Sequence, residues 1–245
     1  RDRLPNVKVW LYAEPDGGAD ASFARPSFAE SFEAVTREAP DSVLDVQRSP
    51  DDLLFIYTGG TTGMPKGVMW RHEALWGALG SGANVRANRG EKPSTPEEHI
   101  ANVAKYGPGP RQLVACPLMH GTGLLTAIGN FTGGGSTLTA GAGSFNAART
   151  FDFVERAQAE SMVIVGDAFA RPMLEALNAE PDRWDLASLK VILSSGVMWS
   201  REIKEGLLDH FPSLALADLF GSSEAVGFGT SVTSRKAKAR GTTAK

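Results

Sequence analysis

A loop rich in glycine, threonine and lysine follows a short apolar run and has the composition of a phosphate-binding site. The apolar run is residues 53–56, and the loop, residues 57–67, reads Tyr-Thr-Gly-Gly-Thr-Thr-Gly-Met-Pro-Lys-Gly. Glycines let the main chain bend so that amides and threonine hydroxyls converge on an anion, and Lys66 adds a mobile charge. The residues expected to bind phosphate are Thr58, Gly59, Gly60, Thr61, Thr62, Gly63 and Lys66.

The loop does not follow the Walker pattern, in which Gly-Lys is followed by Ser or Thr. Pro65 stands directly before Lys66 and has no amide hydrogen to donate to a phosphate. Gly67 follows the lysine and has no hydroxyl for a metal ion. The pattern G-x-G-x-x-G is also absent from the loop. The loop therefore predicts a nucleotide site of another kind, with a glycine-rich surface turn as the alternative.

Three later segments carry further residue types suited to nucleotide chemistry. Residues 117–123, Pro-Leu-Met-His-Gly-Thr-Gly, place His120 at the start of a predicted helix over 121–131. Residues 191–197, Val-Ile-Leu-Ser-Ser-Gly-Val, form an apolar strand that ends in a glycine turn. Residues 218–224, Asp-Leu-Phe-Gly-Ser-Ser-Glu, combine an aromatic ring, two hydroxyls and a carboxylate.

In this order the four segments resemble the motifs of the acyl-adenylate-forming (AMP-binding) superfamily. That superfamily includes acyl-CoA synthetases, luciferase-like enzymes and the adenylation domains of peptide synthetases. Residues 163–172, with Met-Trp-Arg-His at 69–72, look most like the bacterial fatty-acyl and sterol side-chain acyl-CoA synthetases. The resemblance implies an α/β fold with mostly parallel sheets flanked by helices, part of the family's large N-terminal domain.

The resemblance also implies a reaction. A carboxylic acid, fatty or sterol side-chain, would react with ATP to give acyl-AMP, and CoA would then displace AMP. The attacking carboxylate needs no general base, so the protein would mainly neutralise charge and hold the reactants in line. Two alternatives stay open: transfer of the acyl group to a carrier protein, and a non-catalytic nucleotide-binding fragment. The residues expected to be catalytic are Thr58, Lys66, His120 and Glu224.

The resemblance assigns roles to single residues. His120 would close one wall of the acyl and carboxylate pocket, with a helix cap as the alternative. Glu224 would hold Mg²⁺ between the phosphates, with a capping or solvated glutamate as the alternative. Phe220 stands where the family usually has Tyr, and Ser223 where it has Thr. The remaining nucleotide contacts would come from Ser195, Gly196, Val197, Asp218, Phe220, Gly221, Ser222 and Ser223.

The whole chain, 1–245, is therefore expected to be a partial AMP-binding domain. Residues 84–110 are rich in Asn, Arg, Gly, Pro and Glu and predict a surface insertion with one short helix over 96–105. Later motifs of the family and its small C-terminal lid domain find no counterpart before Lys245. The resemblance thus implies weak or no turnover by the chain alone.

Composition narrows the partners to small molecules. A net charge of -3 and a pI near 5.9 give no general attraction to nucleic acid or anionic membranes. Cys116 is the only cysteine, which excludes an intrachain disulfide and fits the cytoplasm. No apolar run approaches the ~18 residues of a membrane span. The sequence does not predict the oligomeric state.

Short apolar runs alternate with helical patterns at the spacing of a parallel α/β sheet. Cap candidates are Asn146, Asp167 and Ser200. The predicted strands are 7–12, 53–58, 111–116, 136–139, 161–165, 189–193 and 214–219. The predicted helices are 28–38, 72–82, 146–160, 167–178 and 200–211.

Overall fold

The computed structural model describes residues 4–13, 24–59, 64–81, 91–140 and 143–235. These described residues fall into two compact units, one with those up to residue 48 and residue 143, and one with those of 49–140 and 144–235. In the first unit, β1 (Leu11–Tyr12) pairs in parallel with β2 (Glu30–Ser31), and α1 (Phe32–Glu38) follows. The strand predicted over 7–12 is thus only two residues long.

The second unit is built on a six-stranded sheet of order β10-β9-β8-β7-β5-β6. Five strands are parallel, and β10 runs antiparallel to β9 at one edge, so the prediction of a mostly parallel sheet is confirmed. The strands are β5 (Arg111–Val114), β6 (Ser136–Thr139), β7 (Ser161–Ile164), β8 (Val191–Ser194), β9 (Ala215–Ser222) and β10 (Ala225–Thr233). The strand β10 was not expected, because five of its nine residues are glycine, serine or threonine and hide the alternation of a strand.

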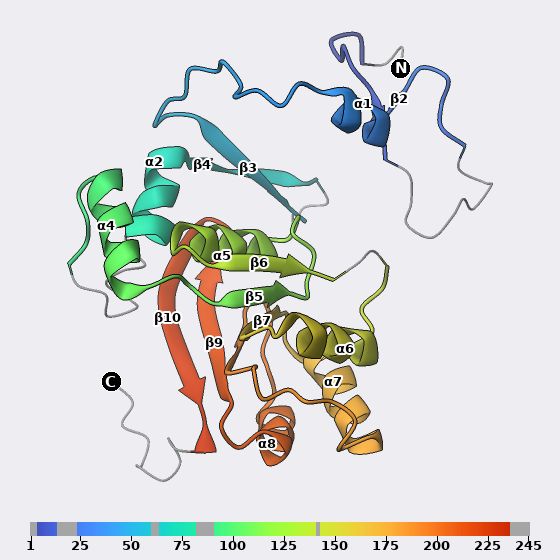
Figure 1. Cartoon of the computed structure of the whole chain (residues 1–245), viewed down its shortest axis with the longest axis vertical. Helices are drawn as coiled ribbons and strands as arrows, with labels where there is room; N and C mark the ends of the chain where they lie inside the picture. The colour runs from blue at the N-terminus through green and yellow to red at the C-terminus, as the bar shows by residue number, and fades with distance from the viewer. Residues whose placement is uncertain (1–3, 14–23, 60–63, 82–90, 141–142, 236–245) are drawn as a thin grey trace. The chain divides into compact units, whose positions relative to one another are not determined.

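Both faces of this sheet are covered (Figure 1). On one face, Met162 and Ile164 of β7 belong to the main hydrophobic core with side chains from three helices. On the other face, Val163 packs with Ala127 of α5 (Gly121–Thr132). Alternate residues of one strand are therefore buried on opposite sides, which explains why β7 reads as a continuous apolar run. The three helices are α6 (Ala147–Ala157), α7 (Asp167–Ala179) and α8 (Arg201–His210).

The segment that carries the phosphate-type loop forms a hairpin. Here β3 (Leu53–Thr58) pairs with β4 (Lys66–Arg71), which was not predicted as a strand, and Thr58 stands opposite Lys66. The helix predicted over 72–82 is divided into α2 (His72–Leu75) and a π-helix, η1 (Trp76–Ser81). The predicted short helix exists as α4 (Pro96–Tyr106), and its N-cap Thr95 accepts from Glu98 N.

One of the three predicted helix caps is confirmed, one is partly so and one is wrong. Asn146 Oδ1 accepts from Arg149 N and caps α6. Ser200 occupies the N-cap position of α8 without a side-chain cap hydrogen bond. Asp167 is not a cap, because Gly166 holds the N-cap position of α7. The Asp167 carboxylate instead accepts from Ser200 N at 2.9 Å and so joins the start of α7 to the start of α8.

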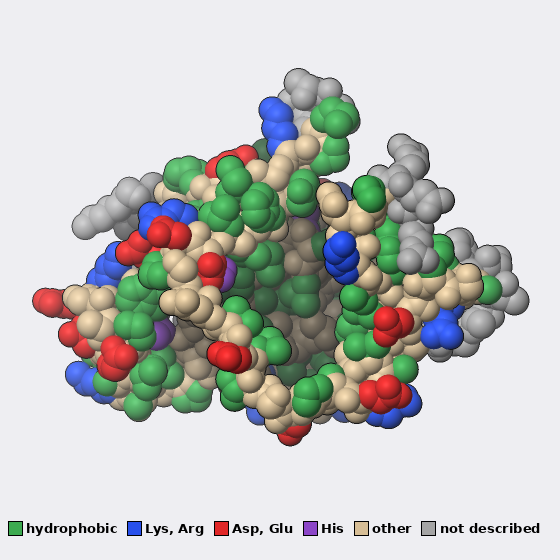
Figure 2. All heavy atoms as spheres, turned by 90° about the horizontal axis from the view of Figure 1, so that it is seen from above, with side chains coloured by type: hydrophobic (Ala, Val, Ile, Leu, Met, Phe, Trp, Pro, Cys, Tyr) green, Lys and Arg blue, Asp and Glu red, His purple; other side chains and the backbone are tan. Residues whose placement is uncertain are grey.

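Figure 2 shows acidic and basic side chains interspersed among hydrophobic and neutral ones on the face that it draws. None of the helices formed by the described residues is both long and apolar enough to cross a lipid bilayer.

Candidate active site

A hydrogen bond joins the β3–β4 hairpin to the turn between β9 and β10. The indole Nε1 of Trp70, on β4, donates to the Ser223 carbonyl at 2.7 Å. The Trp70 ring also packs against the small core formed by Ile56, Leu75, Leu79 and Leu125. Two segments more than 150 residues apart in the sequence are therefore fixed beside each other.

The N-terminus of α5 meets two further loops at the same place. His120 is the N-cap residue, and its Nδ1 accepts from Thr122 N at 3.2 Å. A neutral imidazole that accepts at Nδ1 carries its proton on Nε2, which makes Nε2 a donor. A Cβ atom at Gly196 would lie 3.5 Å from His120 Cε1, and one at Gly121 would lie 3.2 Å from Ser223 Oγ. The glycine turn and the β9–β10 turn thus both reach the start of this helix.

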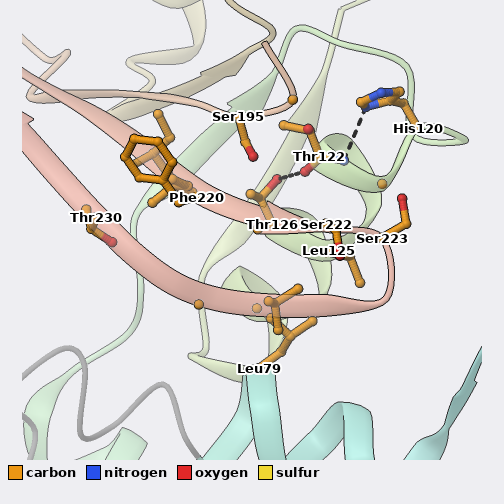
Figure 3. A pocket seen from close by; sticks show the side chains of 18 of the residues that line it. Leu79, His120, Thr122, Leu125, Thr126, Ser195, Phe220, Ser222, Ser223 and Thr230 are labelled. Carbon is orange, nitrogen blue, oxygen red and sulfur yellow. Dashed lines mark hydrogen bonds between the residues drawn. The ribbon is translucent and has the colours of Figure 1, made fainter. Parts of the chain in front are cut away.

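These segments enclose a cavity of about 690 Å³. Ser195 and Gly196, which follow the carboxyl end of β8, contribute to its wall, and open α/β sheets usually bind ligands at that end of their strands. Figure 3 shows side chains from α5, β9, β10 and η1 around it, including Thr122, Phe220, Thr230 and Leu79. Hydroxyl and glycine residues line it together with the apolar side chains of Leu79, Leu125, Leu193, Leu219 and Val226. Such a mixture suits a ligand that is polar at one end and apolar at the other.

The structure brings nine of the sequence-predicted site residues onto this one wall. They come from four segments that are distant in the sequence, and Phe220 is 60% exposed and available for stacking. The nine are Thr58, His120, Ser195, Gly196, Phe220, Gly221, Ser222, Ser223 and Glu224.

Four predicted residues do not line the cavity. Lys66 is exposed at the start of β4, and Thr58 Oγ1 donates to its carbonyl at 3.4 Å. The Asp218 carboxylate pairs with Lys204, both side chains being less than one fifth exposed. Gly59 and Val197 are also not on the wall. The remaining predicted residues Gly60, Thr61, Thr62 and Gly63 lie outside the described residues.

Sequence reasoning missed other residues of the site. Trp70 was quoted only as part of a family-like string, although an indole in an otherwise half-exposed strand indicates a specific partner. Gln112 also lines the cavity, and its signal in the sequence is a polar residue within a mostly apolar predicted strand. Thr230 and Leu79 also line the cavity. They were missed because the sequence did not predict β10 as a strand or residues 76–81 as a π-helix. A π-helix is rare and often occurs at functional sites.

The single cysteine lies beside the site and is chemically inert there. Cys116 is 4% exposed and belongs to the core cluster with Val114, Ala127 and Val163. Burial raises the pKa of its thiol to about 11, well above its ordinary range. Because the thiolate is the nucleophile, this residue is no candidate for covalent catalysis.

The family model described as AMP-binding enzyme matches residues 5–245. The chain belongs to this family. Among curated AMP-binding proteins, a medium/long-chain-fatty-acid–CoA/3-oxocholest-4-en-26-oate–CoA ligase of Mycobacterium marinum is 34% identical over 232 residues. A 3-oxocholest-4-en-26-oate–CoA ligase of Rhodococcus rhodochrous is 33% identical over 241 residues. These alignments cover 93% and 97% of this chain but only 40% and 42% of those proteins.

Solved structures of AMP-binding enzymes share the fold. The inhibitor-bound N-terminal domain of FACL13 from Mycobacterium tuberculosis aligns with a TM-score of 0.62 and 19% identity, covering 86% of this chain and 47% of that one. A luciferase-like enzyme from the mealworm Zophobas morio aligns with a TM-score of 0.59 and 18% identity, covering 89% and 46%. At such identities the likeness establishes the α/β fold of an adenylate-forming N-terminal domain.

Proposed function

We propose that the protein to which this chain belongs activates a carboxylic acid with ATP to acyl-AMP and then forms the CoA thioester, in the cytoplasm. The observation that carries the proposal is the cavity, whose wall joins Thr58, His120, Gly196 and the turn 222–224 to apolar side chains such as Leu79 and Leu125. A nucleotide would occupy the polar part and the acid the apolar part. Fatty or sterol side-chain acids are the proposed substrates, because the curated relatives are named for them.

The residues on the wall supply groups for each part of the reaction. Thr58 and Ser223 carry hydroxyls that can donate to phosphate oxygens, and the start of α5 adds a positive dipole end. Phe220 offers an exposed ring face for the adenine. His120 stands where the nucleotide and acid parts of the cavity meet, with Nε2 as a donor. This arrangement stabilises charge and orients reactants, which is what transfer of the adenylyl group from ATP to a carboxylate requires.

The site also fits a magnesium ion shared with the phosphates. Magnesium is typically bound through one or two carboxylates plus substrate oxygens rather than by an all-protein cage. Glu224 supplies one carboxylate on the wall, and no cluster of three or more metal-ligating side chains occurs among the described residues. Glu224 would hold the ion, which would neutralise charge on the phosphates.

Calorimetric titration of the chain with ATP and Mg²⁺ tests the proposal. We expect the affinity to fall at least tenfold, about 1.4 kcal/mol, in Glu224→Ala and in Ser223→Ala, because both side chains line the cavity. The matched control is Glu175→Ala, an exposed glutamate on α7 away from the cavity, which should bind as the unaltered chain does. Absence of ATP binding by the folded chain, or equal affinity in all four proteins, would overturn the proposal.

A further inference from the structure

The helix α5 contains three glycines, and packing explains only two of them. At Gly123 a Cβ atom would lie 2.5 Å from the Pro117 carbonyl oxygen, so a larger residue does not fit. At Gly121 it would lie 3.2 Å from Ser223 Oγ, which is closer than nine in ten such contacts. At Gly129 the nearest atom would be 3.9 Å away, an ordinary van der Waals distance. Alanine would therefore fit at Gly129 without moving its neighbours.

The backbone does not require a glycine at position 129 either. A glycine is needed where φ is positive, and Gly129 lies within α5 and is not one of the glycines with positive φ. Inside a helix, glycine is less favourable than alanine because it loses more conformational freedom on folding. Gly129 thus weakens the helix without a gain in packing or in turn geometry. The missing side chain calls for another explanation.

The space beside Gly129 belongs to the cavity. Gly129 is half-buried and contributes to the wall, as does Leu79 of η1 (Figure 3). The two atoms nearest to a Cβ atom at position 129 would both belong to Leu79, at 3.9 and 4.0 Å. Thr132 Oγ1 lies 3.0 Å from the Gly129 carbonyl oxygen and 3.2 Å from that of Leu79, which ties η1 to α5 at this level. A side chain longer than that of alanine would therefore extend past Leu79 into the cavity.

Gly129 lies at the end of α5 remote from the nucleotide motifs. Gly121, Leu125 and Gly129 follow one another at intervals of four residues, so they share one face of the helix, and all three line the cavity. Gly121 adjoins Ser223, and Gly129 is eight residues further on, about 12 Å along the helix axis. An acid whose carboxylate lies beside Ser223 would reach Gly129 with the distal part of its chain.

We propose that Gly129 determines how long an acyl chain the cavity accepts. Its missing side chain leaves open the space that the distal part of the acyl chain occupies, and a larger residue would end that space about 12 Å from the carboxylate. The inference rests on the proposed function, because it places the carboxylate at the end occupied by His120 and Ser223. It adds to that function a single residue that sets chain-length specificity without touching the reacting atoms.

The test is calorimetric titration of the chain with non-hydrolysable acyl-adenylate analogues, from the acetyl analogue upward in two-carbon steps. In the unaltered chain, affinity should still rise when the acyl chain grows beyond the length that reaches Gly129. In Gly129→Leu the rise should stop at that length. Each methylene group that is no longer buried lowers affinity about fourfold, so two or more such groups should lower the affinity of a long analogue relative to the acetyl analogue at least about tenfold.

Two further variants separate the loss of space from an effect on folding. Gly129→Ala should raise Tm by about 2–4 °C because alanine favours the helix, yet it should weaken the long analogues about fourfold relative to the acetyl one. The matched control is Gly77→Leu. Gly77 of η1 does not line the cavity, and a Cβ atom there would meet only Lys92 Nζ, at 3.9 Å. Its length profile should equal that of the unaltered chain.

Each outcome decides a different point. An unchanged length profile in Gly129→Leu overturns the inference and leaves the proposed function intact. An equal loss of affinity for all analogues, or a lower Tm in Gly129→Ala, overturns it as well, because the glycine would then serve the structure of α5. Failure of the unaltered chain to bind any analogue overturns the proposed function and the inference together. If circular dichroism shows that Gly129→Leu is unfolded, the length profile of Gly129→Ala decides.

Discussion

Replacing Trp70 by phenylalanine should loosen the candidate site without removing any group that touches the ligand. The substitution deletes the 2.7 Å hydrogen bond from Trp70 Nε1 to the Ser223 carbonyl but keeps an aromatic ring in the small core. A hydrogen bond of this kind contributes about 1 kcal/mol to folding. For a chain of this size that corresponds to a fall in Tm of about 2–4 °C.

Part of this lost free energy should also weaken the binding of a ligand. In the unaltered chain the turn that carries Ser223 and Glu224 is already held against the hairpin, whereas in the variant the ligand must order it. If all of the ~1 kcal/mol moves into binding, the Kd for an acyl-adenylate analogue rises about fivefold. Isothermal titration calorimetry measures this change, and differential scanning calorimetry measures Tm on the same protein.

Trp184→Phe is the matched control. Trp184 Nε1 donates to Asp152 Oδ1 at 2.6 Å, and neither residue lines the cavity. Both variants lose one indole hydrogen bond, so both should lower Tm, but only Trp70→Phe should weaken binding. Equal Kd values for the two variants would refute the reasoning that the hairpin positions the β9–β10 turn.

Three further predictions concern folding and reactivity. Gly123→Ala should lower the free energy of unfolding by about 1–3 kcal/mol in urea denaturation, because its Cβ would lie 2.5 Å from the Pro117 carbonyl oxygen. Asn146→Ala should cost about 1 kcal/mol in the same assay, since it removes the cap bond to Arg149 N; an unchanged midpoint would contradict it. Cys116 should resist iodoacetamide until the chain unfolds. The pKa of its thiol is raised from 9.0 to about 11 in the folded state. The free energy of unfolding should therefore fall as pH rises from about 9 to 11, because the thiol ionises in the unfolded chain before it ionises in the folded one.

The sequence predicted the central sheet and its helices because their signals are local. Residues 162–164 are buried on both faces and form an apolar run, and Asn146 caps its helix as its residue type predicts. The strand β10 and the antiparallel β4 were missed because glycine, serine and threonine in the first, and lysine and arginine at the ends of the second, obscure a period of two. Their pairing comes from tertiary contacts rather than from propensity.

The candidate site was predictable as a set of motifs but not as a geometry. Four segments that are separate in the sequence meet at one cavity, yet Asp218 pairs with Lys204 instead of lining it. No local pattern distinguishes a carboxylate that faces a ligand from one that faces a neighbouring helix.

The proposed function requires one cavity to hold a nucleotide and an acyl chain together. Titration of the chain with AMP and with a non-hydrolysable acyl-adenylate analogue tests this requirement most directly. The analogue should bind at least about a hundredfold more tightly than AMP, because its acyl part is buried beside the same nucleotide site and binding becomes intramolecular. Equal affinities for AMP and the analogue would contradict the claim.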